Sequence, residues 1–201
     1  GDWQAGGAIV YYQLWKITSD IKWKNAFKKV LDVLVTICTS SEPKTDTAYH
    51  FHGDCTISVG NDDFANHILM MGYKLFGDKK YLKILSDRLQ DELASQDDRG
   101  AFPGYGGTFV TALELLESLD FFASEGIKIM DTEKLQASLM KAARFSLSLQ
   151  EKNSPDRFML GGVYGQSNYA HARDVVHGRD TGYAMHLWLK LAGFSAKTFS
   201  M

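Results

Sequence analysis

The last long connection of this chain concentrates polar and aromatic side chains. Asn168, Tyr169, His171 and Arg173 fall within six residues, and Asp180 directly precedes the next predicted helix. Histidine and tyrosine can transfer protons, and asparagine and arginine can hold a carboxylate through hydrogen bonds. We therefore predict these five residues as catalytic candidates. The alternative is a surface loop whose Arg and Asp side chains pair with each other while Tyr169 packs on a helix end.

The first long connection carries residue types that bind metal ions. His50, His52, Asp54 and Cys55 are closely spaced, and their order resembles the zinc motif of metallo-β-lactamase-like hydrolases, with Cys in place of the last His. Zinc accepts His and Cys ligands at such spacing. The strands that flank that motif are not predicted here, so His50, His52 and Asp54 are weak metal candidates and a solvated loop is favoured. We expect no cofactor.

The two cysteines say little about redox state. Cys38 lies on an apolar helix face and Cys55 in a loop, so they can pair only if the fold brings them together. Free cysteine is usually a small buried hydrophobic residue. We therefore favour free thiols.

Length and composition predict a single domain covering residues 1–201. The chain is 45% hydrophobic and 23% charged, which is ordinary for a soluble globular protein. Its net charge of −2 argues against a nucleic-acid partner, and no apolar run is long enough to span a membrane. Because Gly1 is not a natural initiator, we expect a processed chain, or the C-terminal part of a larger protein.

Seven segments predict α-helices, because their apolar residues recur at spacings of three and four. The second segment shows this clearly with Phe27, Leu31 and Leu34. No segment alternates with period two for long, so strands should be few and short. The predicted helices cover approximately residues 8–17, 21–38, 61–76, 79–93, 108–123, 131–150 and 181–192.

Two internal repeats indicate how these helices are joined. The first is an Asp-x-Lys-aromatic motif at the short turns, beginning at Asp20 and again at Asp78. The second is a Gln, a glycine-rich aromatic segment and a Thr, where Gln96 and Thr111 match Gln150 and Thr181. Short turns thus alternate with long connections, which predicts stacked helical hairpins with all the long connections at one end.

On these motifs the chain resembles α/α-toroid proteins, which include six-hairpin glycosidases, toroidal polysaccharide lyases, and the terpene cyclase and prenyltransferase toroids. The Trp-Gln-Ala-Gly start at Trp3 and the Thr-Ser-Asp-x-Lys-Trp turn at Thr18 resemble the carbohydrate-active branch more closely. The resemblance covers nearly the whole chain and implies an all-α, toroid-like array of helical hairpins. Seven helices cannot supply six hairpins, so we expect an incomplete toroid that a missing segment or second chain completes.

The resemblance implies a carbohydrate-active domain, a polysaccharide lyase or glycoside hydrolase acting on an acidic poly- or oligosaccharide. In toroidal lyases, Asn, His or Arg neutralises the uronate carboxylate while Tyr or His moves the proton during β-elimination. By this analogy Tyr169 and His171 would transfer protons beside Asn168 and Arg173. An extracytoplasmic location would follow by association.

Further ligand contacts are predicted near the ends of the helices. Aromatic rings beside glycines can stack on sugar rings, and paired acids at a helix start could act as glycosidase carboxylates. Helix capping is the competing explanation for the acid pair. The substrate-binding candidates are Trp3, Tyr105, Tyr164, His177, Arg179, Asp62 and Asp63.

Two other functions remain open. One is a non-catalytic helical-repeat scaffold that binds a protein partner on its concave face. The other is an isoprenoid-cyclase-like toroid, although a clear Asp-rich motif or zinc site for that chemistry is not evident. An enzyme predicts that the polar groups of the last connection converge in one pocket with His50, His52 or Asp62. A scaffold predicts local pairing beside an exposed apolar strip.

Overall fold

The computed structural model describes residues 2–39, 65–103, 107–128, 130–164, 176 and 178–193, apart from the side chains of residues 2–5, 37, 39 and 179. These residues form seven α-helices and no strand, only isolated bridges, which confirms the all-α prediction. None of the described helices is long and apolar enough to cross a membrane. The helices are α1 (Asp2–Thr18), α2 (Ile21–Thr39), α3 (Ala65–Phe76), α4 (Lys79–Ser95), α5 (Gly107–Glu125), α6 (Thr132–Ser148) and α7 (Gly178–Leu191).

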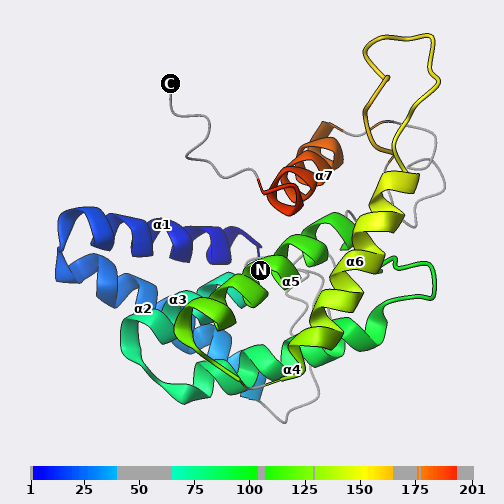
Figure 1. The fold of residues 1–201 in the computed structure, drawn as a ribbon. Helices are drawn as coiled ribbons and strands as arrows, with labels where there is room; N and C mark the ends of the chain where they lie inside the picture. Colours follow the sequence, from blue (N-terminus) through cyan, green and yellow to red (C-terminus); the bar gives the residue numbers. More distant parts are fainter. Residues whose placement is uncertain are drawn as a thin grey trace.

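The helices pack side by side as hairpins (Figure 1). α1 packs against α2, α3 against α4 and α5 against α6, and a short turn joins each pair. α1 also contacts α3, α3 contacts α5 and α5 contacts α7, so the odd-numbered helices form a row. Each short turn reverses the chain, and the long connections therefore begin and end away from these turns.

The apolar stripes of all seven helices meet in one main core within the described residues. Phe27 and Leu31 of α2 are fully buried, as their spacing predicts. Burying such a side chain contributes about 1.5–3 kcal/mol, so each stripe fixes the orientation of its helix. The other helices contribute, among others, Ala8, Leu69, Leu85, Leu115, Leu135 and Leu187.

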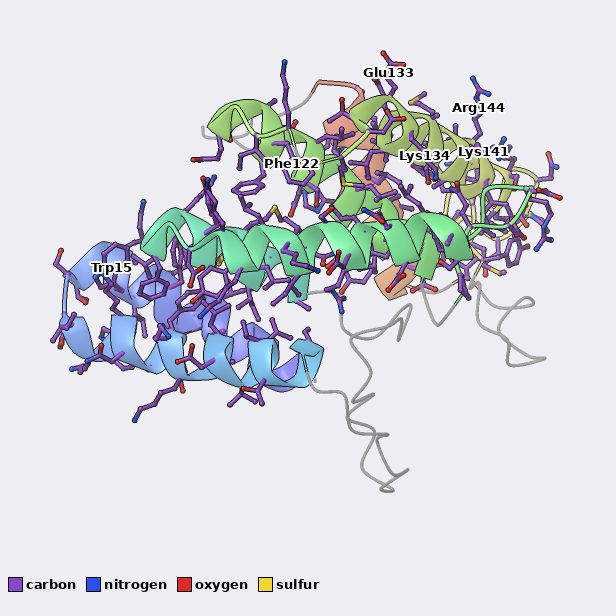
Figure 2. All side chains as sticks on the ribbon, turned by 90° about the horizontal axis from the view of Figure 1, so that it is seen from below. Trp15, Phe122, Glu133, Lys134, Lys141 and Arg144 are labelled. Atoms are coloured by element: carbon purple, nitrogen blue, oxygen red, sulfur yellow. The ribbon has the colours of Figure 1, made fainter. Side chains whose placement is uncertain are left out.

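α6 presents a charged face away from the rest of the fold. Glu133, Lys134, Lys141 and Arg144 are exposed, and Figure 2 shows their side chains on the outer side of this helix. Leu135 is fully buried in the core. α6 is therefore an amphipathic helix whose apolar side packs on α5.

The first internal repeat builds the same turn twice. Asp20 and Asp78 each cap the following helix, because each carboxylate accepts a hydrogen bond from the backbone N–H two residues later, at 3.0 and 2.9 Å. The lysine at that position also forms an ion pair with the same aspartate. Its ammonium lies over the next aromatic ring, at 4.9 Å for Lys22 over Trp23 and 5.1 Å for Lys80 over Tyr81.

The residues before these aspartates share a left-handed backbone, with φ of 56° at Ser19 and 67° at Gly77. Glycine adopts this conformation without the clash of a Cβ atom. We predict that Ser19→Gly raises the free energy of unfolding by up to about 1 kcal/mol, and that Gly77→Ser lowers it by a similar amount. A Cβ on Gly77 would meet no other atom, so the exchange isolates the backbone effect. Denaturant unfolding that showed no difference between the two variants would contradict this.

The second internal repeat forms the same hydrogen bonds in two connections. The Gln96 amide donates to the Gly100 carbonyl at 3.1 Å, and the Gln150 amide donates to the Gly161 carbonyl at 3.4 Å. Both glycines have positive φ. At Gly100 a Cβ would also lie 2.5 Å from the carbonyl oxygen of Lys141 in α6. Glycine is therefore required there by both conformation and space.

After each of these connections, a threonine near the start of the next helix accepts a hydrogen bond from the backbone. Thr108 accepts from the Phe102 N–H at 2.8 Å, and Thr181 accepts from the Val163 N–H at 3.0 Å. The predicted match of Thr181 with Thr111 is therefore wrong by three residues. Such a shift is nearly one helical turn, so it leaves the apolar face in the same place and the sequence pattern cannot distinguish the two registers.

Cys38, half-buried at the end of α2, is disulfide-bonded. The prediction of free thiols is therefore wrong for this residue. The sequence contains one other cysteine, Cys55, which lies outside the described residues. An apolar helix position suits a disulfide as well as a thiol, so hydrophobic spacing could not decide between them.

We predict that Cys38→Ser lowers the free energy of unfolding by about 2–4 kcal/mol, because the cross-link restricts the unfolded chain. The measurement is denaturant unfolding with and without dithiothreitol. Reductant should destabilise the wild-type protein to the level of the variant and leave the variant unchanged. A wild-type protein insensitive to reductant would contradict the prediction.

Candidate functional site

Most residues predicted as site members lie outside the described residues. This holds for Asn168, Tyr169, His171, Arg173, His177, Tyr105, Asp62, Asp63, His50, His52 and Asp54. Trp3 lies in α1 and Arg179 in α7, without described side chains. The predicted convergence of the last connection with the first one therefore stays a prediction.

Two predicted site residues are described, and both are held by neighbouring groups. The Tyr164 hydroxyl donates a short hydrogen bond to the Glu151 carboxylate, which lowers the pKa of Glu151. The Tyr164 backbone N–H donates to the Leu149 carbonyl at 3.0 Å. Asp180 lies in the first turn of α7 and is only 1% exposed. The two Tyr164 bonds thus hold the chain close to the end of α6.

The described residues instead bring together a group of ionisable and amide side chains that no motif indicated. We call this group the buried polar cluster. It joins α3, α4, α5 and α7, and its outer members are only partly covered. Its members are Asn66, His67, Arg88, Glu92, Glu114, Glu117 and Lys190.

The inner half of the cluster is organised by the side chain of Asn66, which is completely buried. The Asn66 amide nitrogen donates to a Glu92 oxygen and to a Glu114 oxygen, both at 2.8 Å. The Asn66 carbonyl oxygen accepts from Arg88 Nε at 2.8 Å. Glu92 is 7% exposed and Glu114 3%. One amide thus holds two buried carboxyl groups from two different helices.

The outer half of the cluster is a chain of charges that links α3, α5 and α7. His67 Nε2 contacts a Glu117 oxygen, and Lys190 Nζ donates to the other Glu117 oxygen at 2.6 Å. His67 Nδ1 lies 3.8 Å from a Glu114 oxygen, which connects the two halves. The side chains of His67 and Glu117 are each 24% exposed. The outer half is therefore the more accessible side of the cluster.

Opposite charges shift the pKa values of the outer pair strongly. Burial lowers the pKa of His67, but the neighbouring Glu114 and Glu117 carboxylates outweigh burial and raise that pKa to about 10. Burial raises the pKa of Glu117, but His67 and Lys190 outweigh it and lower that pKa to about 2. At neutral pH the imidazolium and the Glu117 carboxylate are therefore both charged.

Glu92 has a different environment from Glu114. Burial raises the pKa of the Glu92 carboxyl, although the charge of Arg88 opposes this shift. Among the described residues, the second Glu92 oxygen has no hydrogen-bond partner. Glu114 instead lies beside the His67 imidazolium. Burial therefore favours a proton on the Glu92 carboxyl group.

No group of three or more His, Cys, Asp or Glu side chains in the described part of the chain is arranged to hold a metal ion. His186, the other described histidine, is exposed on α7 and outside the cluster. Comparison of the chain with protein-family models, with curated proteins and with solved structures returns no match.

Sequence reasoning missed this cluster because its members occupy helical positions that follow the apolar spacing. Glu92 stands three residues after Leu89, and Glu114 lies inside the apolar run of α5. Acidic residues are rarely buried without partners. An acid at a core position of the apolar spacing was therefore the feature of the sequence that could have indicated the cluster. The position of His67 inside a helix predicts local hydrogen bonds, with membership of a site as the alternative. Its contacts instead come from acids of α5.

We predict a pH dependence of stability that His67 controls. The folded state retains a proton that the unfolded chain loses above its ordinary pKa of 6.5, so stability contributed by His67 falls as pH rises from about 6.5 to about 10. The stability difference between wild type and His67→Gln should shrink across this range in denaturant unfolding. His186→Gln is the matched control and should follow the wild-type profile. If the stability difference between wild type and His67→Gln stayed constant with pH, the His67 imidazolium would contribute nothing to the pH dependence of stability.

Proposed function

We propose that this chain is a carbohydrate-active domain that cleaves an acidic poly- or oligosaccharide by acid–base catalysis, with the buried polar cluster as its proton-transfer centre. The observation that carries the proposal is the pair Glu92 and Glu114 on the shared Asn66 amide. Both hydrolysis and elimination of glycosidic bonds need one group that donates a proton to the leaving oxygen. A second group must accept a proton or attack the sugar directly.

The place of the cluster in the fold supports this proposal. Asn66 and His67 lie in the first turn of α3, and Glu92 lies in the last turn of α4. These are the helix ends that adjoin the long connections. Loops placed on a rigid helical scaffold commonly carry binding residues. We infer a toroid-like arc in which the predicted residues of the last connection, His171 among them, lie at the same end.

The surroundings of the pair favour an acidic ligand. The charge of Arg88 acts on Glu92, and His67 lies beside Glu114. A third cation, Lys190, pairs with Glu117 in the outer half of the cluster. Uronate carboxylates are recognised by such groups. The disulfide at Cys38 supports an extracytoplasmic location, because disulfides persist mainly in oxidising compartments.

A second candidate is a non-catalytic scaffold. Apolar side chains are exposed on both terminal helices of the row: Val10 (54%) and Ile17 (80%) on α1, and Met185 (52%) and Leu189 (37%) on α7. Exposed apolar surface is a feature of interaction sites. The same surfaces would fit an incomplete toroid that a further segment or a second chain completes.

The proposal is tested by incubating the protein with polygalacturonate, alginate, hyaluronan, heparan sulfate and glucuronoxylan. New reducing ends report cleavage, and ultraviolet absorbance reports the unsaturated product of elimination. We expect cleavage of at least one substrate, with kcat lowered about 10²–10⁴-fold in Glu92→Gln and Glu114→Gln, the range for loss of an acid–base group. His171→Ala tests the last connection in the same assay.

Asp87→Asn is the matched control, because Asp87 lies on α4 with its side chain 58% exposed and pairs with Lys83. It should leave kcat unchanged. Circular dichroism and thermal unfolding of each variant separate loss of chemistry from loss of fold. No cleavage of any substrate by the wild-type protein would overturn the enzyme proposal and favour the scaffold.

A further inference from the structure

We infer that the α1–α2 turn and the neighbouring α3–α4 turn dock on the surface of a bilayer that contains anionic phospholipids. We call this part of the molecule the lysine-rich end. Ile17 and Ile21 enter the boundary between headgroups and acyl chains, and the lysines around them contact lipid phosphates. The inference goes beyond the proposed function and does not depend on it. It concerns peripheral contact, which differs physically from a helix that crosses the bilayer.

Two exposed isoleucines flank the first short turn. Ile17, in the last turn of α1, is 80% exposed, and Ile21, the first residue of α2, is 60% exposed. Figure 1 shows this turn at the outer edge of the molecule, on the left. An isoleucine side chain gains free energy when it leaves water. The turn therefore presents an apolar point that the described part of the fold leaves in solvent.

Several polar groups of this turn already have hydrogen-bond partners within it. The Ser19 N–H donates to the Trp15 carbonyl at 2.8 Å, and the Asp20 N–H donates to the Thr18 hydroxyl at 3.2 Å. The Lys22 N–H donates to the Asp20 carboxylate at 3.0 Å, and the Lys22 ammonium pairs with the same carboxylate at 2.9 Å. A lipid environment requires polar groups to be satisfied internally. The turn can therefore approach acyl chains without breaking these bonds.

Lysines dominate the charge around the apolar point. Residues 16–32 and 74–87, which contain the two turns, carry nine lysines and four aspartates, although the whole chain has a net charge of −2. The two turns are neighbours, because Lys24 and Lys28 of α2 lie over the Phe76 ring at the end of α3, at 5.4 and 5.8 Å from its centroid. The lysine-rich end therefore has a positive surplus, which attracts an anionic surface.

The lysines lie over indole rings near the isoleucines. Lys22 Nζ is 4.9 Å from the centroid of the Trp23 ring, and Figure 2 labels Trp15 at the same end of the molecule. Lys24 Nζ is 5.6 Å from the Trp15 ring, and both indoles are half-buried. Membrane proteins place tryptophan at headgroup level, and lysine extends its charge from an apolar stem toward the phosphates. The lysine-rich end thus combines the residue types of a membrane interface.

The exposed isoleucines favour a lipid surface over a soluble acidic polysaccharide. Lysines suit either partner, because carboxylate, sulfate and phosphate groups all accept hydrogen bonds from an ammonium. A polysaccharide offers no apolar phase that Ile17 and Ile21 can enter, whereas the acyl boundary of a bilayer is such a phase. A projecting turn can also contact a plane without any cleft.

The test is co-sedimentation of the full chain with vesicles. We expect binding to phosphatidylcholine vesicles that contain about one-third phosphatidylglycerol, little binding to phosphatidylcholine alone, and release in about 1 M sodium chloride, where charges are screened within about 3 Å. Ile17→Ser/Ile21→Ser should lower the partition coefficient about tenfold or more, because it removes the apolar contact. Lys16→Gln/Lys24→Gln should lower it about tenfold or more, because it removes two cations.

Matched control variants lie on α6. Met140→Ser/Leu147→Ser removes two apolar side chains that are 43% and 44% exposed. Lys134→Gln/Lys141→Gln removes two charges from the outer face of this helix (Figure 2). Both control variants should bind the vesicles as the wild type does. Circular dichroism and thermal unfolding show that each variant keeps its fold.

Each result decides for or against the inference. Loss of binding in both variants of the lysine-rich end, with both controls unchanged, supports it. Binding that Ile17→Ser/Ile21→Ser leaves intact overturns it, because the contact is then electrostatic alone. Equal loss in the α6 controls overturns it and places the contact elsewhere.

Absence of vesicle binding by the wild-type protein also overturns the inference. If fluorescent heparin then binds the wild type and not Lys16→Gln/Lys24→Gln, the lysine-rich end binds an acidic polysaccharide instead. The vesicle assay contains no substrate, so its outcome is separate from that of the cleavage screen.

Discussion

The Asn66 side chain is the point on which the interior of this fold depends. Its amide joins Glu92 of α4 to Glu114 of α5, and its carbonyl accepts from Arg88. Leaving a buried polar group without its hydrogen-bond partner costs about 1–3 kcal/mol, and more where the group is charged. That is a large part of the roughly 5–15 kcal/mol by which domains are stable. The packing of α3, α4 and α5 must therefore keep these atoms within hydrogen-bond distance of one another.

The two internal repeats show how the scaffold around this cluster is made. At the short turns, an aspartate caps a helix and a lysine pairs with it while lying over an aromatic ring. In two long connections, a glutamine amide holds a glycine carbonyl and a threonine hydroxyl accepts a backbone N–H. Local bonds of this kind set the direction in which each helix leaves its turn. The polar cluster then forms where neighbouring hairpins meet.

Individual residues show how far the sequence could be used to predict the site. Tyr164 is predicted as a ligand contact, and the structure adds that its hydroxyl bonds Glu151 in the same connection. The place of His67 inside a helix suggests local hydrogen bonds, yet it contacts two acids of α5. Residue types can be read from the sequence, but convergence depends on crossing angles between helices that are far apart along the chain. His171 and its neighbours stay predictions.

The sequence by itself determined the all-α class, the seven helices and the two turn motifs. These follow from apolar spacing, capping residues and glycine positions, which act within a few neighbouring residues. Tertiary structure alone decided that Asn66 lies between Glu92 and Glu114, and that Thr108 is the counterpart of Thr181. Those contacts depend on how the apolar faces of the helices pack against one another. No local pattern specifies which polar atoms that packing brings within 3 Å.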